Sequence, residues 1–278
     1  MSSTGRSHLA LVTTVSVLLA LLQLAPAGAM NASRLEPPIT AVLVRSWGGC
    51  PPPTESLIWD ELNSRWSDYG TTPIAIDYNH PQLCAGPITV EALASSGADV
   101  VILSDPAGGS QQYSAEEIAA LQQYALDGHN IIGTFLLFHL DVTDNRGLAP
   151  IFGLYADIDY HTAHPPSAAY NLIDPASPLF AGMTDPYQGA GYPHSQAPDD
   201  SSWDPGDLNG AMIVAKTSDN KAAVMVYPRP TYHAIYITTM PEYYGDTTDE
   251  RFLYNAITYP RFSYSVFLPV ILRSWGSD

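Results

Sequence analysis

An alternation of short apolar runs with helical patterns between residues 39 and 138 limits the folds that this sequence can adopt. The apolar runs cover residues 39–47, 73–78, 98–103 and 130–138, and helical patterns at residues 55–69, 89–96 and 114–127 separate them. Each run is apolar on both faces, which is typical of strands in a parallel sheet with helices on each side. We therefore expect an α/β fold.

The clearest helix signal begins at Ser114. Ser114 and Glu117 have the spacing of a capping box, in which each side chain bonds the backbone of the other residue. Ile118 and Leu121 lie on one apolar face, and Gly128 is a typical helix end.

The composition changes after Pro150. Residues 155–210 are rich in Pro, Gly, Asp, Ser and Tyr, which predicts a loop-rich insertion. Apolar runs at residues 212–216 and 222–227 flank a polar turn and predict a late β-hairpin. A strand at residues 233–238 and a helix at residues 248–258 complete the expected elements.

The first 29 residues have the layout of a secretory signal peptide. Arg6 supplies a positive start, residues 9–24 are apolar, and Ala27-Gly28-Ala29 is a small-residue cleavage site. A permanent membrane anchor is the alternative, but the run is short for a span. We expect a signal peptide at residues 1–29, one domain at residues 30–260, a tail at residues 261–278, and a secreted or surface location with no membrane span after cleavage.

Charge and motifs exclude several functions. The formal net charge of −17 repels nucleic acid and anionic lipid. Neither a phosphate-binding loop nor a Gly-x-Ser-x-Gly motif occurs, so we exclude nucleotide hydrolysis and serine hydrolysis. We also expect no cofactor. Asp157, Asp159 and His161 would share one face of a strand, but a solvated polar strand is the preferred interpretation over a metal site.

Residues 128–141, GHNIIGTFLLFHLD, have the form of a buried strand that runs into a turn at the base of an α/β active site. Many enzymes carry a nucleophile at such a turn. This turn offers Thr134, Phe135 and Leu136. A threonine in a strand is most often a packing residue.

Three segments together resemble the class I glutamine amidotransferase-like superfamily and its ThuA-like relatives. They are SGADVVILSDP with the following YSAEEIAALQQYALDGHNIIGTF, then NLIDPASPLFAGM, and finally AIYITTMPEYYGDTTDERFLYNAITY. The resemblance covers about residues 39–260. It implies a flavodoxin-like three-layer sandwich with a mostly parallel sheet, a late hairpin and a loop-rich insertion.

Active members of this superfamily use a Gly-x-Cys-x-Gly elbow and a late His-Pro-Glu. The same pattern places Gly133 on the first glycine, Phe135 on the cysteine and Leu137 on the second glycine. Met240 and Glu242 stand where the histidine and glutamate would be. A phenyl ring cannot attack a carbonyl and a thioether cannot accept its proton, so the resemblance predicts a chain that is not a glutamine amidotransferase.

Polar and aromatic side chains follow the ends of the expected strands, where open parallel sheets bind ligands. The candidate cleft comprises Trp47, Asp77, His80, Asp105, His139, Asp141, Glu242 and Tyr243. Aromatic faces beside carboxylates suit a sugar or another polyol.

Cys50 and Cys84 lie just past the first and second strands. In a flavodoxin-like order these strands are neighbours, so a disulfide between the two loops is feasible in an oxidising compartment. A free thiol is the alternative.

We expect a secreted, non-catalytic binding or accessory domain, with carbohydrate or a cell-surface component as its partner. One alternative is an enzyme on a sugar-like substrate that uses His139, Asp141, Asp105 and Glu242. Another is a surface-displayed structural module, because YSVFLPVILR at residues 264–273 resembles the sorting tails of exported proteins. That segment could instead be an extra edge strand.

Overall fold

The structure is a computed structural model that describes residues 37–44, 57–104, 113–135, 137–138, 140–156, 160–163, 169–191, 195–198, 208–217 and 220–260. The chain divides into two compact units, residues 1–36 and 37–278, and every described residue belongs to the second. The expected signal peptide and tail lie outside the described residues and stay predictions. Within the described part, no helix is long and apolar enough to cross a membrane.

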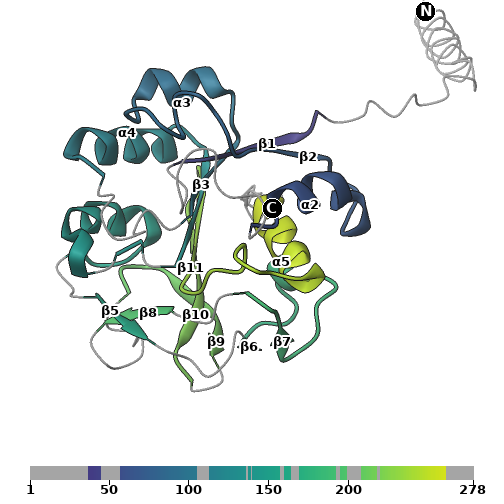
Figure 1. The fold of residues 1–278 in the computed structure, drawn as a ribbon. Coiled ribbons are helices and arrows are strands. Elements are labelled where there is room, and N and C mark those ends of the chain that lie inside the picture. Colours follow the sequence, from purple (N-terminus) through teal and green to yellow (C-terminus); the bar gives the residue numbers. More distant parts are fainter. Residues whose placement is uncertain are drawn as a thin grey trace, which may run out of the picture. The chain divides into compact units, whose positions relative to one another are not determined.

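The second unit is built on a nine-stranded mixed sheet (Figure 1). Its order is β2 (Ile74–Asp77), β1 (Ile39–Leu43), β3 (Val100–Ser104), β4 (Asn130–Thr134), β11 (His233–Ile237), β10 (Ala222–Pro228), β9 (Met212–Thr217), β6 (Ala169–Leu172) and β7 (Tyr187–Gln188). A separate antiparallel pair joins β5 (Tyr160–Ala163) and β8 (Ser195–Pro198).

The expectation of a mostly parallel sheet is wrong. The first five strands in the order pair in parallel, and the pairs from β11 to β7 are antiparallel. Parallel neighbours need long crossovers that contain helices, and the chain before β4 supplies them. The strands β9, β10 and β11 follow one another along the chain with short connections, which favours antiparallel pairing.

Helices cover both faces of the sheet (Figure 1). Side chains of α3 (Val90–Ser96), α4 (Ala115–Leu126) and the 3-10 helix η2 (Leu140–Phe152) belong to one buried apolar cluster. Side chains of α2 (Trp59–Arg65), α5 (Thr247–Ile257) and the 3-10 helix η3 (Pro178–Phe180) belong to a second. A further 3-10 helix, η1 (Trp66–Asp68), continues α2. The α/β sandwich expected from the alternation is therefore present.

Several local expectations agree with the structure. The capping box of Ser114 and Glu117 opens α4, and the late hairpin forms from β9 and β10. The helix expected from residue 55 begins only at Trp59. The segment expected to be a loop-rich insertion supplies β6 and β7 to the main sheet, because short strands can pair without a strong sequence pattern of their own.

Candidate functional site

The strand β4 ends in a sharp turn at Phe135, whose backbone has a left-handed φ of 56°. For a bulky residue this conformation is an outlier that neighbouring contacts must hold. The Phe135 N–H donates to the carbonyl oxygens of Ile237 at 2.9 Å and Thr239 at 3.0 Å. The Phe135 carbonyl accepts from the Tyr236 hydroxyl at 2.8 Å. Residues in and just after β11 thus fix an elbow directly after β4.

Packing explains the glycine that precedes this elbow. A Cβ atom at Gly133 would lie 2.7 Å from Leu137 Cδ2 and 2.9 Å from Phe152 Cζ. Both distances are well below ordinary carbon–carbon contacts. Leu137 therefore packs closely against β4 and occupies the space beside Gly133.

Phe135 and Met240 belong to the same buried apolar cluster. Phe135 is 6% exposed and Met240 is 1% exposed. The hydrogen bond from Phe135 to Thr239 brings the elbow to the residue immediately before Met240. The two positions that the sequence resemblance aligns with a thiol and an imidazole are thus both occupied by apolar side chains in one core region.

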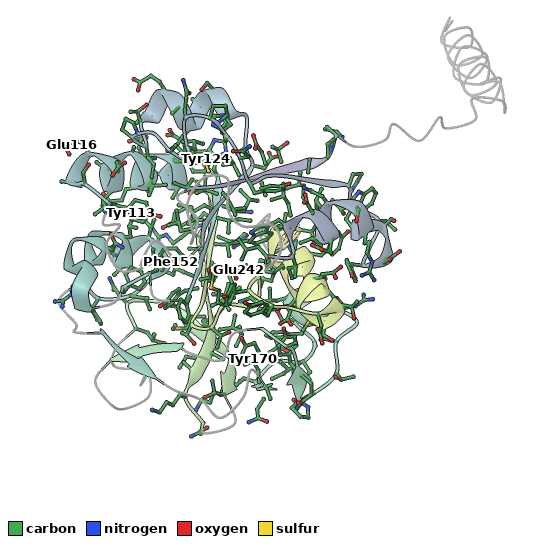
Figure 2. The ribbon with its side chains drawn as sticks, viewed as in Figure 1. Tyr113, Glu116, Tyr124, Phe152, Tyr170 and Glu242 are labelled. Atoms are coloured by element: carbon green, nitrogen blue, oxygen red, sulfur yellow. The ribbon has the colours of Figure 1, made fainter. Side chains whose placement is uncertain are left out.

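Glu242 is fully buried and faces β4. Its Oε1 accepts a hydrogen bond from Thr134 Oγ1 at 2.5 Å, and Thr134 is also fully buried. Its main-chain carbonyl accepts from the N–H of Ile58 at 3.1 Å. Figure 2 marks Glu242 in the interior of the unit. The carboxylate therefore ties the loop after β11 to the end of β4.

Residues 187–191, which we call the cover segment, pack against the loop that contains Met240. A Cβ atom at Gly191 would lie 2.6 Å from Pro241 Cα and 2.9 Å from the Met240 carbonyl oxygen. The N–H groups of Ala190 and Gly191 donate to Asp249 Oδ2 at 2.8 Å and 3.1 Å. The Tyr187 hydroxyl donates to the other oxygen of Asp249. The cover segment is thus fastened to the first turn of α5.

Buried polar groups continue from Asp249 towards the elbow. Burial raises the pKa of Asp249 to about 6, against hydrogen bonds that lower it. Tyr170 stacks on Tyr187 with ring centroids 4.7 Å apart, and its hydroxyl hydrogen-bonds the Thr239 hydroxyl. Burial, with the nearby carboxylates of Asp249 and Glu242, raises the pKa of Tyr170 well above its usual value. Its hydroxyl therefore stays neutral.

The structure separates the predicted cleft residues into two groups. Glu242 and Tyr243 lie at the elbow, whereas Asp77 is the last residue of the edge strand β2 and His80 follows it. Three strand spacings separate β2 from β4, or about 14 Å at roughly 4.8 Å each. Trp47, Asp105, His139 and the side chain of Asp141 lie outside the described part, so their places in the cleft stay predictions.

Asp77 and His80, at the end of β2 and just after it, make mainly local contacts. The Asp77 carboxylate is exposed and accepts from the N–H of Asn79 at 3.1 Å. His80 is half-buried, and its Nδ1 accepts from the N–H of Leu83 at 3.3 Å. Both side chains keep polar atoms available to a ligand at this edge.

One exposed aromatic residue beside the elbow was not predicted from the sequence. Tyr244 is 61% exposed and has a left-handed φ of 57°. Its ring centroid lies 4.1 Å from that of Tyr243. A Cβ atom at the next residue, Gly245, would lie only 2.2 Å from the Pro241 carbonyl oxygen, so the loop doubles back tightly. The adjacent tyrosines at 243 and 244 are the only sequence signal that could have indicated an exposed aromatic side chain here.

Two of the cavities that described residues line lie away from the elbow. One, of about 310 Å3, lies at the amino ends of β1, β3 and β4. The other, of about 470 Å3, lies along residues 81–95. No group of three or more His, Cys, Asp or Glu side chains suited to a metal ion occurs within the residues that the structure describes.

Comparison with known proteins identifies the fold through solved structures alone. No family model and no curated protein matches the sequence. A protein from Bacteroides uniformis described as ThuA-like is 13% identical, with a TM-score of 0.55 over 82% of this chain and 94% of its own. A cytoplasmic protein from Salmonella typhimurium is 12% identical, with a TM-score of 0.52 over 78% of this chain and 97% of its own.

A protein from Thermoplasma acidophilum described as part of a GMP synthase is 14% identical. It covers 80% of this chain and 93% of its own, but its TM-score of 0.43 is too low to support an argument. At these identities the similarity concerns the fold. The chain shares an α/β fold with the ThuA-like protein, and its activity has to be argued from its own residues.

Proposed function

We propose that this chain is a secreted, non-catalytic domain of the ThuA-like, class I glutamine amidotransferase-like type that acts as a binding or accessory module. The observation that carries the proposal is the pair Phe135 and Met240. Both are buried in one apolar cluster at an elbow of the kind that holds a nucleophile. The parallel strand order β2-β1-β3-β4-β11 supports the flavodoxin-like assignment for this half of the sheet.

The chemistry of the elbow argues against amide hydrolysis. Covalent catalysis needs a nucleophile with a proton acceptor within hydrogen-bond reach. Neither the phenyl ring of Phe135 nor the thioether of Met240 can fill these roles. Glu242 could orient a histidine, but its carboxylate is buried and accepts from Thr134 instead. The proposed alternative enzyme would also need Glu242, and a fully buried carboxylate is poorly placed for substrate.

The cover segment supports the same conclusion. Gly191 lies so close to Pro241 and the Met240 carbonyl that no side chain fits between them. The hydrogen bonds to Asp249 hold this segment in place. A substrate would have to displace it to reach position 240.

The ligand that we propose is a carbohydrate or a glycan of the cell surface. Tyr244 offers an exposed aromatic face at the carboxyl end of the central parallel strands. An open α/β sheet binds its ligands at this end. Sugars stack their apolar faces on aromatic rings and direct their hydroxyls to neighbouring polar groups. The unusual backbone conformation of Tyr244 is consistent with a functional display.

The proposal also includes export by the signal peptide and a disulfide bond between Cys50 and Cys84. Export through the signal peptide would place Cys50 and Cys84 in an oxidising compartment. Cys84 is buried, and no free cysteine occurs among the described residues, which supports a disulfide; Cys50 itself lies outside them. Intact mass with and without reductant tests the bond.

A thermal-shift screen of the chain from Met30 with soluble mono- and oligosaccharides, with and without calcium, tests the proposal. A ligand at a hundred times its Kd would stabilise the protein by about 2.7 kcal/mol and raise the Tm by roughly 5–10 °C. Tyr244→Ala should abolish the shift, whereas Tyr155→Ala, which removes another exposed tyrosine, should keep it. If no saccharide raises the Tm, or if the protein releases ammonia from glutamine, the proposed function is contradicted.

A further inference from the structure

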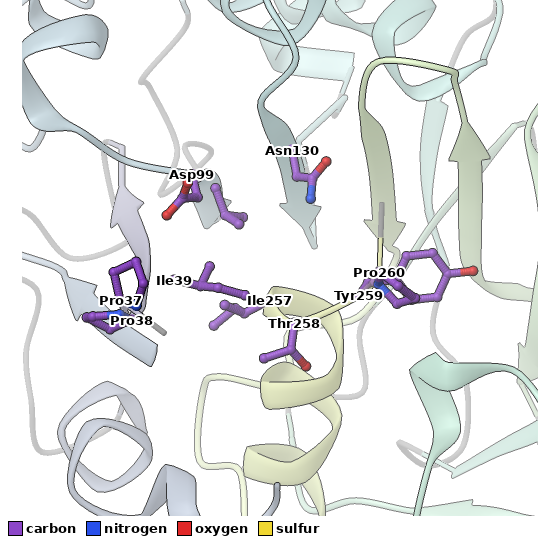
Figure 3. A pocket seen from close by; sticks show the side chains of 10 residues that line it. Pro37, Pro38, Ile39, Asp99, Asn130, Ile257, Thr258, Tyr259 and Pro260 are labelled. Carbon is purple, nitrogen blue, oxygen red and sulfur yellow. The ribbon is translucent and has the colours of Figure 1, made fainter. Parts of the chain in front are cut away.

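The cavity of about 310 Å3 (Figure 3) lies at the amino ends of β1, β3 and β4, whereas the elbow follows the carboxyl end of β4. The first residues of β1, β3 and β4 form one side, and the end of α5 with the residues after it forms the other. Pro37, Pro38 and Tyr259 supply apolar walls. Its volume is about ten times the share of one water molecule in the liquid, so the cavity can take a bulky side chain.

Two polar side chains face this space (Figure 3). Asn130 is only 7% exposed, and its Oδ1 accepts from the N–H of His233 at 2.9 Å. Its Nδ2 has no hydrogen-bond partner in the part of the chain that the structure describes. Asp99 Oδ2 accepts from the N–H of Thr40 at 3.0 Å, and Oδ1 has no described partner either.

An amide donor beside a carboxylate acceptor complements a peptide group, which presents a carbonyl oxygen and an N–H. A hydrogen bond from this donor to a bound peptide would contribute about 0.5–1.5 kcal/mol. The apolar walls would accept the side chain next to that peptide group. The cavity therefore has the chemistry of a site for an extended apolar peptide.

The chain itself supplies a peptide of this kind. Pro260 lines the cavity, and 18 residues follow it. Residues 262–273, FSYSVFLPVILR, contain no acidic residue, and Arg261 and Arg273 flank their apolar positions. Positive charge suits a chain whose net charge is −17. At about 3.3–3.6 Å per extended residue, Phe262 and Phe267 can both reach the cavity from Pro260.

We propose that residues 262–273 bind in this cavity of the same chain, with the peptide backbone paired to Asn130 and Asp99 and an aromatic side chain between the apolar walls. Binding within one chain benefits from a high effective concentration, because Pro260 tethers the segment at the cavity. This inference is independent of the proposed function at the elbow.

Site-specific photo-crosslinking in the full chain from Met30 tests the proposal. A benzophenone amino acid replaces Phe262 in one variant and Phe267 in another, and peptide mass spectrometry locates the crosslinks after irradiation. We expect at least one variant to crosslink within the chain to residues 37–39 or 257–260. Crosslinks elsewhere, crosslinks between two chains, or none in either variant would overturn the proposal.

A second measurement separates specific binding from chance proximity. Asn130→Asp keeps the acceptor for His233 but removes the amide donor. If the segment binds as proposed, amide hydrogen exchange at residues 257–259 should become about two- to tenfold faster in Phe267→Ser, as expected for loss of one modest interaction. The same substitution should add little further in the Asn130→Asp background. Fully additive effects would contradict the proposed pairing.

Discussion

Substitution of Gly191 by alanine tests whether the cover segment closes the elbow. The new Cβ would lie 2.6 Å from Pro241 Cα and 2.9 Å from the Met240 carbonyl oxygen. Ordinary contacts need about 3.5–4.0 Å, so the two backbones would have to separate by roughly 1 Å. Because both contacts are with main-chain atoms, no rotamer change relieves them. We expect a loss of about 1–3 kcal/mol in the free energy of unfolding.

The separation should also expose Met240 to solvent. For a domain of this size the Tm should fall by roughly 2–12 °C, since each kcal/mol shifts it by about 2–4 °C. Hydrogen peroxide followed by peptide mass spectrometry measures oxidation of each methionine. Met240 should oxidise faster in the variant, while Met212, which is 48% exposed, should oxidise alike in both proteins and serve as an internal standard.

Gly97→Ala is the matched control. Gly97 has a φ of 63° and no neighbour within 4 Å of a Cβ atom, so alanine there is strained without a clash. Its cost should be about 1–2 kcal/mol. This variant should lose stability without faster oxidation of Met240. If Gly191→Ala leaves both the Tm and the oxidation of Met240 unchanged, the cover segment does not close the elbow.

Three further substitutions test the contacts around the site. Thr134→Val removes the donor to buried Glu242 and should cost about 1.5–3 kcal/mol in chemical denaturation; an unchanged midpoint would refute the bond. Burial raises the pKa of Asp249 in the folded protein to about 6, from an ordinary value of 3.8. The contribution of protonated Asp249 to the free energy of unfolding is therefore fully present below pH 3.8 and is lost as pH rises to 6. Relative to Asp249→Asn, the unfolding free energy should fall by about 3 kcal/mol between these values; parallel pH profiles would contradict this. Asn63→Leu removes the amide that bonds both the N–H (2.8 Å) and the carbonyl (2.9 Å) of Ile76 on edge strand β2. Without this amide the backbone of β2 is free to pair with a second molecule, so we expect self-association in sedimentation velocity. A variant that stays monomeric and as stable as the parent would refute this protective role of Asn63.

Short sequence motifs correctly predicted those helices and strands whose ends are fixed by residues nearby in the sequence. The capping box at Ser114 and Glu117 and the hairpin of β9 and β10 are encoded within short windows. The alternation of strands and helices was sufficient for the α/β class. Where the pattern was weak, in residues 155–210, the sequence predicted loops and the structure instead places β6 and β7 in the main sheet.

The site depends on contacts that no short window contains. The strand expected to run to residue 138 ends at Thr134, because Phe135 takes a left-handed conformation held by Tyr236 and the residues that follow it. The cover segment depends on Asp249, which is about 60 residues away along the chain. A resemblance to known elbows could indicate which positions meet, but neither periodicity nor composition could show that they are buried.

The proposed function depends on positions 135 and 240 meeting at an elbow that could hold a thiol beside an imidazole. The pH dependence of alkylation of the introduced thiol, followed by mass spectrometry, tests this in Phe135→Cys and in Phe135→Cys/Met240→His, once circular dichroism confirms that both fold. A neighbouring imidazolium stabilises a thiolate, so the double variant should show a thiol pKa at least about one unit below that of the single variant. Identical pH profiles would mean that the two side chains do not meet, and the assignment of this elbow would be wrong.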